Sequence, residues 1–337
     1  MMFKLALFLL LLLPGPRMTV LEEEQRDGYV CRLVEYRTAP RERVQAYLLV
    51  PDGASRRAKT PGLVLLHDHG ARFDIGKEKL VRPLPSAPEH IRLSSDQWAE
   101  ANFDGARFGD SLARCGFTVI VPDMLYWGSR SSAECREWSR LTFLEPQRKE
   151  RIRELKTKVY EGQRAVFDSL ASKGVVWAEQ TLREDTRAVR VLSRLPYVNS
   201  RRIGAFGWSM GAHRCWLLAA RCRQVKTGVA LCWMTLKQTC AQPPTASDYS
   251  MMIPSLREKY DFPDIALELA PKPFFFLSGA QDRLFPKWAV DSAFTRMHAI
   301  YDASSASEAL RTEFFDGPHH CGATVQQTIT DYLTANL

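Results

Sequence analysis

Short apolar runs alternate with longer amphipathic segments along most of the chain. The predicted strands cover residues 43–51, 62–70, 116–123, 202–209, 227–234, 272–279 and 311–317. Those between residues 62 and 277 are apolar at nearly every position, which is typical of strands buried on both faces of a parallel sheet. The predicted helices cover residues 104–116, 179–195, 212–222, 287–301 and 323–337. This alternation predicts an α/β fold, with a mostly parallel central sheet flanked by helices.

Two stretches interrupt the alternation. Residues 129–178 are charged and helix-prone, and residues 235–270 are rich in Pro, Thr and Met. Both lie between predicted core elements, where caps are commonly inserted. The chain has 337 residues, of which 45% are hydrophobic and 25% charged, a composition that suits one large globular domain. We therefore expect a single domain over residues 28–337 with these two insertions.

The N-terminal residues MMFKLALFLLLLLPGP carry a lysine followed by an apolar run. The run is too short to span a bilayer and fits the hydrophobic region of a signal peptide. We therefore expect residues 1–17 to be a signal peptide, with export of the protein and no integral membrane span. If translation starts at Met18, the expectation is a cytoplasmic protein.

Charge and cysteine patterns argue against nucleic acid and zinc as ligands. The net charge is +8, but Lys and Arg are interspersed with acids, as in RKERIRELKTK, and no nucleic-acid motif accompanies them. The chain has eight cysteines, irregularly spaced and without a C-x-x-C pair. Apolar surroundings such as VALCW favour buried free thiols over disulfides or a zinc site.

A G-x-S-x-G sequence stands where a predicted strand gives way to a helix, in IGAFGWSMGAH at residues 203–213. Gly207 and Gly211 permit a sharp turn that larger side chains would block. Ser209 is then presented at the carboxyl edge of the sheet, where ligands gather in α/β folds. The helix start leaves the amide of Met210 free to receive developing negative charge. This arrangement predicts a nucleophilic serine.

A nucleophilic serine needs a histidine base and an acid that orients the base. Asp282 follows the predicted strand 272–279 and is the expected acid, in the chain order serine, acid, histidine. Asp264 is an alternative, but it precedes that strand. Asp316 lies too close in sequence to the histidines to be the first choice.

Two adjacent histidines follow the last predicted strand, in GPHHCG. Only one of them can reach Ser209, because neighbouring side chains in a loop point in different directions. His319 is the expected base since a glycine stands two residues before it. His320 is the alternative.

The segment HDHGA at residues 67–71 follows an early strand, where the second oxyanion donor of such sites is usually found. We expect the backbone N–H of Ala71 to be that donor, beside Met210. A metal site at His67, Asp68 and His69 is disfavoured, because successive residues at a strand end face opposite ways and no further cluster completes a site.

With these residues in view, the chain resembles the α/β-hydrolase superfamily, and within it dienelactone-hydrolase-like and acetyl-xylan-esterase-like bacterial enzymes. The resemblance runs from about Gly28 to the C-terminus. Its motifs are LLHDHGARFDIGKEK, VIVPDMLYWGSR, GWSMG, YDFPDIALELAPKPFFFLSGAQDRLFP and GPHHCG. It implies the α/β-hydrolase fold, with Ser209 as nucleophile, Asp282 as acid and His319 as base.

The sequence departs from these families at three places. His320 stands where a glycine is common, Ala71 and Arg72 replace a tyrosine that some acetyl esterases carry, and serine replaces the cysteine nucleophile of dienelactone hydrolases proper. A serine nucleophile favours ester hydrolysis.

We therefore expect a serine carboxylic-ester hydrolase that needs no cofactor or metal. The resemblance implies a small acyl group such as acetyl, and a small-molecule or carbohydrate ester as substrate. Arg72, Lys77, Trp127 and Trp208 are expected to line the cleft, although Trp208 has the alternative of packing beneath the turn. A serine peptidase of the same fold commonly adds a β-propeller, for which this chain has no room. A non-catalytic binding protein is disfavoured because all three triad residue types occur in order.

Overall fold

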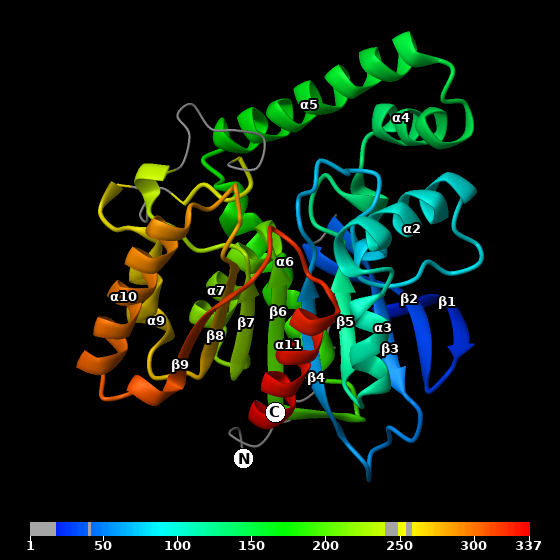
Figure 1. Ribbon diagram of the computed structural model, residues 1–337. Helices are drawn as coiled ribbons and strands as arrows, with labels where there is room; N and C mark the ends of the chain where they lie inside the picture. Colours follow the sequence, from blue (N-terminus) through cyan, green and yellow to red (C-terminus); the bar gives the residue numbers. More distant parts are fainter. Residues whose placement is uncertain (1–17, 40–41, 240–248, 254–257) are drawn as a thin grey trace, which may run out of the picture.

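The computed structural model describes residues 18–39, 42–239, 249–253 and 258–337, so the predicted signal peptide at residues 1–17 lies outside the described residues (Figure 1). A nine-stranded sheet forms the centre, in the order β1-β2-β3-β5-β4-β6-β7-β8-β9. The strands are β1 (Met18–Arg26), β2 (Tyr29–Ala39), β3 (Glu42–Pro51), β4 (Thr60–Leu66), β5 (Thr118–Pro122), β6 (Val198–Trp208), β7 (Thr227–Leu231), β8 (Phe274–Gly279) and β9 (Leu310–Phe315).

Helices lie on both faces of this sheet. The α-helices are α2 (Glu89–Phe103), α3 (Phe108–Arg114), α4 (Ala133–Leu144), α5 (Lys149–Ala171), α6 (Trp177–Ser193), α7 (Met210–Arg221), α9 (Ala266–Leu269), α10 (Lys287–Ala303) and α11 (Ala323–Asn336). The short 3-10 helices are η1 (Lys77–Lys79), η2 (Gly128–Arg130), η3 (Lys237–Thr239), η4 (Phe262–Ile265) and η5 (Ser307–Ala309). In Figure 1, α3 and α11 lie in front of the sheet and α6 and α7 behind it.

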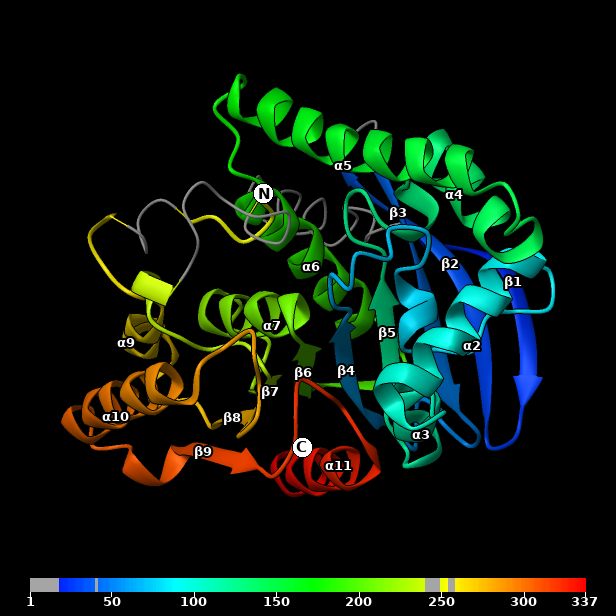
Figure 2. The same cartoon turned by 45° about the horizontal axis from the view of Figure 1, so that its top comes forward.

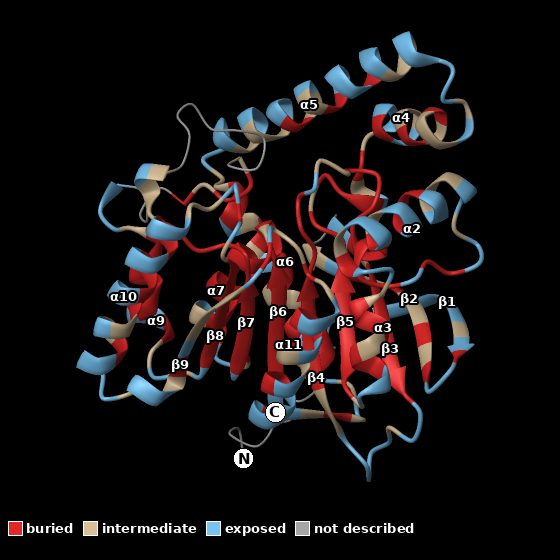
Figure 3. Cartoon of the chain, in the orientation of Figure 1, coloured by how far each residue is buried: buried red, intermediate tan, exposed pale blue. Residues whose placement is uncertain are grey.

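The predicted α/β fold is confirmed. The six strands in the order β5-β4-β6-β7-β8-β9 are parallel to their neighbours. Strands β4, β5, β7 and β8 and the C-terminal half of β6 are almost wholly buried, as Figure 3 shows. Because parallel strands point the same way, their carboxyl ends meet at one edge. That edge carries the loops after β4, β6, β8 and β9, from which the candidate site is built.

Sequence reasoning missed the edge strands β1 and β2. They form an antiparallel hairpin that pairs with β3, so the sheet begins upstream of the predicted domain start at residue 28. The run MTVLEEEQR of β1 is mostly exposed and carries charges, which hides it from a search for apolar strands. Helix α2 was missed for a similar reason, because two of its four buried positions are serines, Ser94 and Ser95.

The predicted insertion 129–178 consists mainly of the helices α4 and α5. Figures 1 and 2 place them beyond the carboxyl edge of the sheet. Helix α5 lies close to the loop after β5. The hydroxyl of Tyr126, in that loop, donates a hydrogen bond to the carbonyl of Val159, in α5, at 2.6 Å. A Cβ on Gly162 would lie 2.4 Å from that hydroxyl. In the described part of the insertion 235–270 the chain forms η3, η4 and α9.

The described cysteines are free, and all but Cys115 are buried; Cys240 lies outside the described residues. This agrees with the prediction of buried thiols. No helix in the described ranges combines the length and the hydrophobicity that a bilayer crossing requires.

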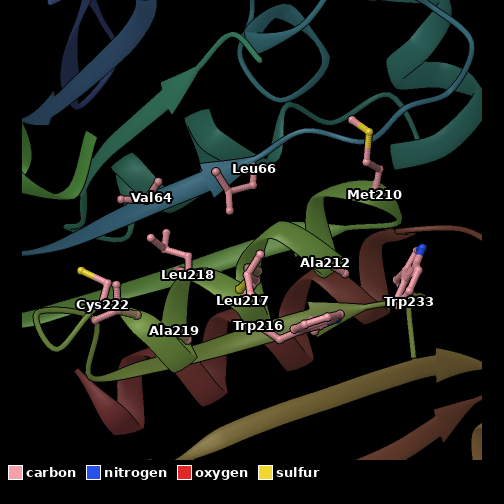
Figure 4. Packing of buried hydrophobic residues seen from close by; sticks show 14 of the residues in the cluster. Val64, Leu66, Met210, Ala212, Trp216, Leu217, Leu218, Ala219, Cys222 and Trp233 are labelled. Atoms are coloured by element: carbon pink, nitrogen blue, oxygen red, sulfur yellow. The ribbon is translucent and has the colours of Figure 1, made fainter. Parts of the chain in front are cut away.

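Helix α7, which begins at the predicted nucleophile turn, is buried along most of its length. Leu217 and Leu218 pack against Val64 and Leu66 of β4 (Figure 4). His213 is also buried here, with ring centroids 4.3 Å from Trp216 and 4.6 Å from Trp233. Burial lowers the pKa of His213 from 6.5 to about 3, because the charged imidazolium loses its hydration.

The buried state of His213 predicts that acid destabilises the protein. Between about pH 6.5 and 3 the unfolded chain binds a proton here that the folded chain excludes, so the free energy of unfolding falls as the pH falls. One such group contributes about 1.4 kcal/mol per pH unit. Urea titrations at pH 6, 5 and 4 would test this. As the pH falls, the free energy of unfolding should decrease less steeply for His213→Phe than for the wild type, by about 1.4 kcal/mol per pH unit. Parallel pH curves for the two proteins would contradict the interpretation.

Candidate active site

Ser209 occupies a strained turn between β6 and α7. Its φ and ψ are 54° and −127°, a conformation that a non-glycine residue adopts only when the surrounding structure imposes it. A Cβ on Gly207 would lie 1.9 Å from the carbonyl oxygen of Gly211, and one on Gly211 would lie 1.9 Å from that of Leu66. The two glycines are therefore required by close backbone approach, as the sequence predicted.

Asp282 and His319 form a hydrogen-bonded pair. Asp282 Oδ2 lies 2.6 Å from His319 Nδ1, and Asp282 Oδ1 accepts from the backbone amides of Leu284 at 2.8 Å and Phe285 at 3.3 Å. The carboxylate is buried. These contacts fix the acid and leave Nε2 of His319 as the nitrogen that points away from it.

Two aromatic rings contact the imidazole of His319. The Phe285 ring stacks on the imidazole at 5.9 Å between centroids, and Trp208 lies at 5.4 Å. Cys232 adds a buried thiol, so that one ligand atom from each of Cys232, Asp282 and His319 lies within 4.8 Å of the others. Burial raises the pKa of the Cys232 thiol, which keeps it neutral beside the acid and base.

The alternative triad members have other partners. His320 Nε2 bonds Asp104 Oδ1 at 2.8 Å. Asp264 forms a capping box at the start of η4 and an ion pair with Arg296 at 2.6 Å, while Asp316 accepts from the Gln281 side chain at 2.8 Å. The structure thus brings together Asp282 and His319 and leaves the alternatives outside the pair.

A cavity of about 430 Å³ contains Ser209 and His319 in its wall. Among the described residues, its lining is Asp68, His69, Gly70, Ala71, Trp98, Asn102, Trp208, Ser209, Met210, Trp233, Thr235, Thr239, Met251, Leu284, Phe285 and His319. Trp208 lines the cavity, which is the first of its two expected roles, and its buried ring also packs against Phe103 at 5.2 Å between centroids. Sequence reasoning missed Trp98, Trp233 and Phe285, which carry no signal beyond being aromatic.

Three residues predicted to line the cleft lie outside this cavity lining. The Arg72 side chain turns to Ser94, Gln97 and Asp74. Lys77 is buried in an ion pair with Asp123 at 2.8 Å and another with Glu78 at 2.6 Å. These predictions were wrong because both side chains pair with acids and polar groups away from the cavity, some of them close in sequence and others, such as Gln97 and Asp123, from distant segments.

The prediction for Trp127 was wrong as well. Its ring is fully buried, and its indole N–H donates to the carbonyl of His69 at 3.1 Å. Trp127 therefore supports the loop after β4 from behind rather than facing the cavity.

Of the two predicted oxyanion donors, Met210 and Ala71, one has an amide that another group of the protein already accepts from. Met210 is the first residue of α7, and the amide at this position has no acceptor one turn earlier within the helix. The N–H of Ala71, in contrast, donates to Nδ1 of His69 at 2.9 Å. Ala71 has φ 52°, and this turn directs its amide back to the preceding side chain instead of leaving it for a ligand.

Buried charges and a buried imidazole fix the loop at residues 67–71. His67 bonds the Asp68 carbonyl through Nδ1 and accepts from the Met124 amide through Nε2, and burial lowers the pKa of His67 well below its ordinary value. Asp68 forms an ion pair with Lys79 at 3.2 Å. Burial raises the pKa of Asp68 and lowers that of Lys79, because each charge is removed from water. His67, Asp68 and His69 thus each have a separate partner within the protein.

Comparisons with known proteins agree with this architecture. The model of the dienelactone hydrolase family matches residues 98–304. The Bacillus subtilis (strain 168) protein YtaP, described as a hydrolase, is 22% identical over 315 residues, which are 92% of this chain and 89% of YtaP.

Solved structures share the α/β-hydrolase fold. A Bacteroides fragilis NCTC 9343 protein described as an acetyl xylan esterase has a TM-score of 0.65 at 16% identity, over 93% of this chain and 73% of its own. A glucuronoyl esterase from Solibacter usitatus has a TM-score of 0.61 at 11% identity, over 96% of this chain and 86% of its own. At these identities the likeness establishes the fold.

Proposed function

The chain belongs to the dienelactone hydrolase family, and from this premise we propose that it is a serine carboxylic-ester hydrolase with the triad Ser209, Asp282 and His319. The observation that carries the proposal is the hydrogen bond of 2.6 Å between the buried Asp282 and His319, where His319 lines the same cavity as the strained Ser209. A serine alone would be a weak nucleophile, and a base without an acid would lack a fixed tautomer.

In the proposed mechanism, Asp282 accepts the Nδ1–H of His319, so that Nε2 is the basic nitrogen. Nε2 takes the proton of Ser209 as its oxygen attacks the ester carbonyl, and the tetrahedral oxyanion is stabilised by the amide of Met210 at the positive end of α7. His319 then returns the proton to the leaving alcohol. Water, activated by the same nitrogen, attacks the acyl-serine and releases the acid.

We propose a small acyl group, such as acetyl, on a small-molecule or carbohydrate alcohol. The rings of Trp98, Trp208 and Trp233 give the cavity broad apolar faces, while Asn102 and Thr235 add polar groups, a combination that suits both the acyl group and a hydroxylated alcohol. The likeness to a protein described as an acetyl xylan esterase supports this substrate class.

A test of the function combines turnover with covalent labelling. We expect the protein to hydrolyse p-nitrophenyl acetate and acetylated xylo-oligosaccharides, and a p-nitrophenyl alkylphosphonate to inactivate it with one phosphonyl group on Ser209. Mass spectrometry of peptides from the labelled protein would locate the group. Turnover of a peptide p-nitroanilide but not of the esters would favour a peptidase, and no turnover or labelling would favour a binding protein.

A further inference from the structure

The carbonyl oxygen of His69 is held in the protein interior by several donors. It accepts from Lys79 Nζ at 2.8 Å, from the Trp127 indole N–H at 3.1 Å and from the Arg72 amide at 3.4 Å. Lys79 and Trp127 are fully buried. The carbonyl of the His69–Gly70 peptide therefore faces away from solvent.

The direction of this carbonyl fixes the direction of the next amide. The peptide is trans, since the one cis bond among the described residues is Ala270–Pro271. In a planar trans peptide the C=O and N–H groups point in opposite directions. The N–H of Gly70 thus points away from Lys79 and Trp127, and Gly70 is exposed and lines the cavity that contains Ser209.

Resting on the proposed function, we propose that the amide of Gly70, rather than that of Ala71, is the second oxyanion donor, and that Lys79 and Trp127 are its positioning residues. The neighbouring amide of Ala71 is occupied by His69 Nδ1 at 2.9 Å. The turn at residues 69–72 thereby sends one amide inward to a side chain and the other outward to the cavity.

The local packing explains why glycine occupies position 70. Its φ is 54°, in the left-handed region that glycine adopts without steric cost. A Cβ would lie 2.2 Å from the Trp98 ring and 2.6 Å from Asp68 Oδ2. A side chain at this position would thus push the turn away from its present place.

Lys79 is bound entirely within this loop and its supports. Besides His69, its ammonium donates to the Asp68 carbonyl at 2.8 Å and to Asp68 Oδ2 at 3.2 Å, and it lies 5.0 Å from the centroid of the Trp98 ring. Because Lys79 is buried and these acceptors match its three protons, it acts on the reaction through the loop.

A structure of the Ser209 phosphonate adduct tests the donor directly. We expect the phosphonyl oxygen within about 3 Å of the nitrogens of Gly70 and Met210. An oxygen bonded to the Ala71 nitrogen, with His69 turned away, would overturn this inference while leaving the serine mechanism intact. Failure to form the adduct would instead overturn the proposed function, and this inference with it.

Kinetics of Trp127→Phe test the positioning role. The oxyanion is absent from the bound ester and develops only on the way to the tetrahedral intermediate, so weaker positioning lowers kcat and leaves KM nearly unchanged. We expect kcat for p-nitrophenyl acetate to fall about tenfold, below the 10²- to 10³-fold loss typical of removing a whole donor. Trp177→Phe is the matched control, because that indole is equally buried and its N–H has no hydrogen-bond partner among the described residues. Equal kcat values for the two variants would overturn the role of Trp127.

The double variant Lys79→Met/Asp68→Asn removes Lys79, the other positioning residue, together with its ion-pair partner, so that no unpaired buried charge remains. We expect kcat to fall about 100-fold, with KM within about twofold and the rate of phosphonylation reduced in parallel with kcat. A circular dichroism spectrum and melting curve establish that the variant is folded. A folded variant with wild-type kcat would overturn the role of Lys79.

Discussion

Ser209→Ala should reduce the turnover of p-nitrophenyl acetate by about 10⁴- to 10⁶-fold, the range found when a triad member is removed from serine hydrolases. In the proposed mechanism the hydroxyl of Ser209, which lines the cavity from a strained turn at the start of α7, forms the acyl-enzyme, and alanine has no hydroxyl to acylate. The variant should still hydrolyse the ester faster than water alone does, because it can bind the substrate and keeps its oxyanion donors.

The fold provides a clear control for this substitution. Ser209 bonds Leu231 through its backbone amide at 2.8 Å and Ala212 through its carbonyl at 2.7 Å, and alanine retains both contacts. The melting temperature should therefore stay within a few degrees of the wild type. A rate for Ser209→Ala within tenfold of the wild type would refute the serine as nucleophile.

His319→Ala should cost a comparable factor, about 10⁴-fold or more in kcat, whereas His320→Ala should retain activity within a few-fold. Only His319 bonds the buried acid Asp282. His320 bonds the exposed carboxylate of Asp104, which also caps α11 by accepting from the Ala323 amide at 2.8 Å. The expected effect of His320→Ala is thus a modest loss of stability.

Parallel measurements of kcat and melting temperature distinguish these effects. Added imidazole should restore part of the activity of His319→Ala, because the small base can occupy the space beside Phe285 and Trp208 that the side chain vacates. If only His320→Ala lost activity, the pair Asp282–His319 would be structural and the base assigned here would be wrong.

Much of the fold is predictable because its signals are local. The strands at the centre of the sheet are buried on both faces, so their apolar runs are visible in the sequence. The hairpin of β1 and β2 and the helix α2 are exposed on one side and mix polar with apolar residues. Their structure follows from pairing and packing with neighbours rather than from a pattern of their own.

The site divides in the same way. By itself the sequence determined the turn around Ser209 and the order of Ser209, Asp282 and His319 along the chain, because two glycines and short loops after strands specify those features locally. Only the tertiary structure decided that His319 bonds Asp282 while His320 bonds a residue 216 positions away. It also decided that Lys77 pairs with Asp123 and that the Ala71 amide is occupied. Such choices depend on buried charges and hydrogen-bond donors finding partners from remote segments, and the physical requirement to satisfy each of them appears only when the chain is packed.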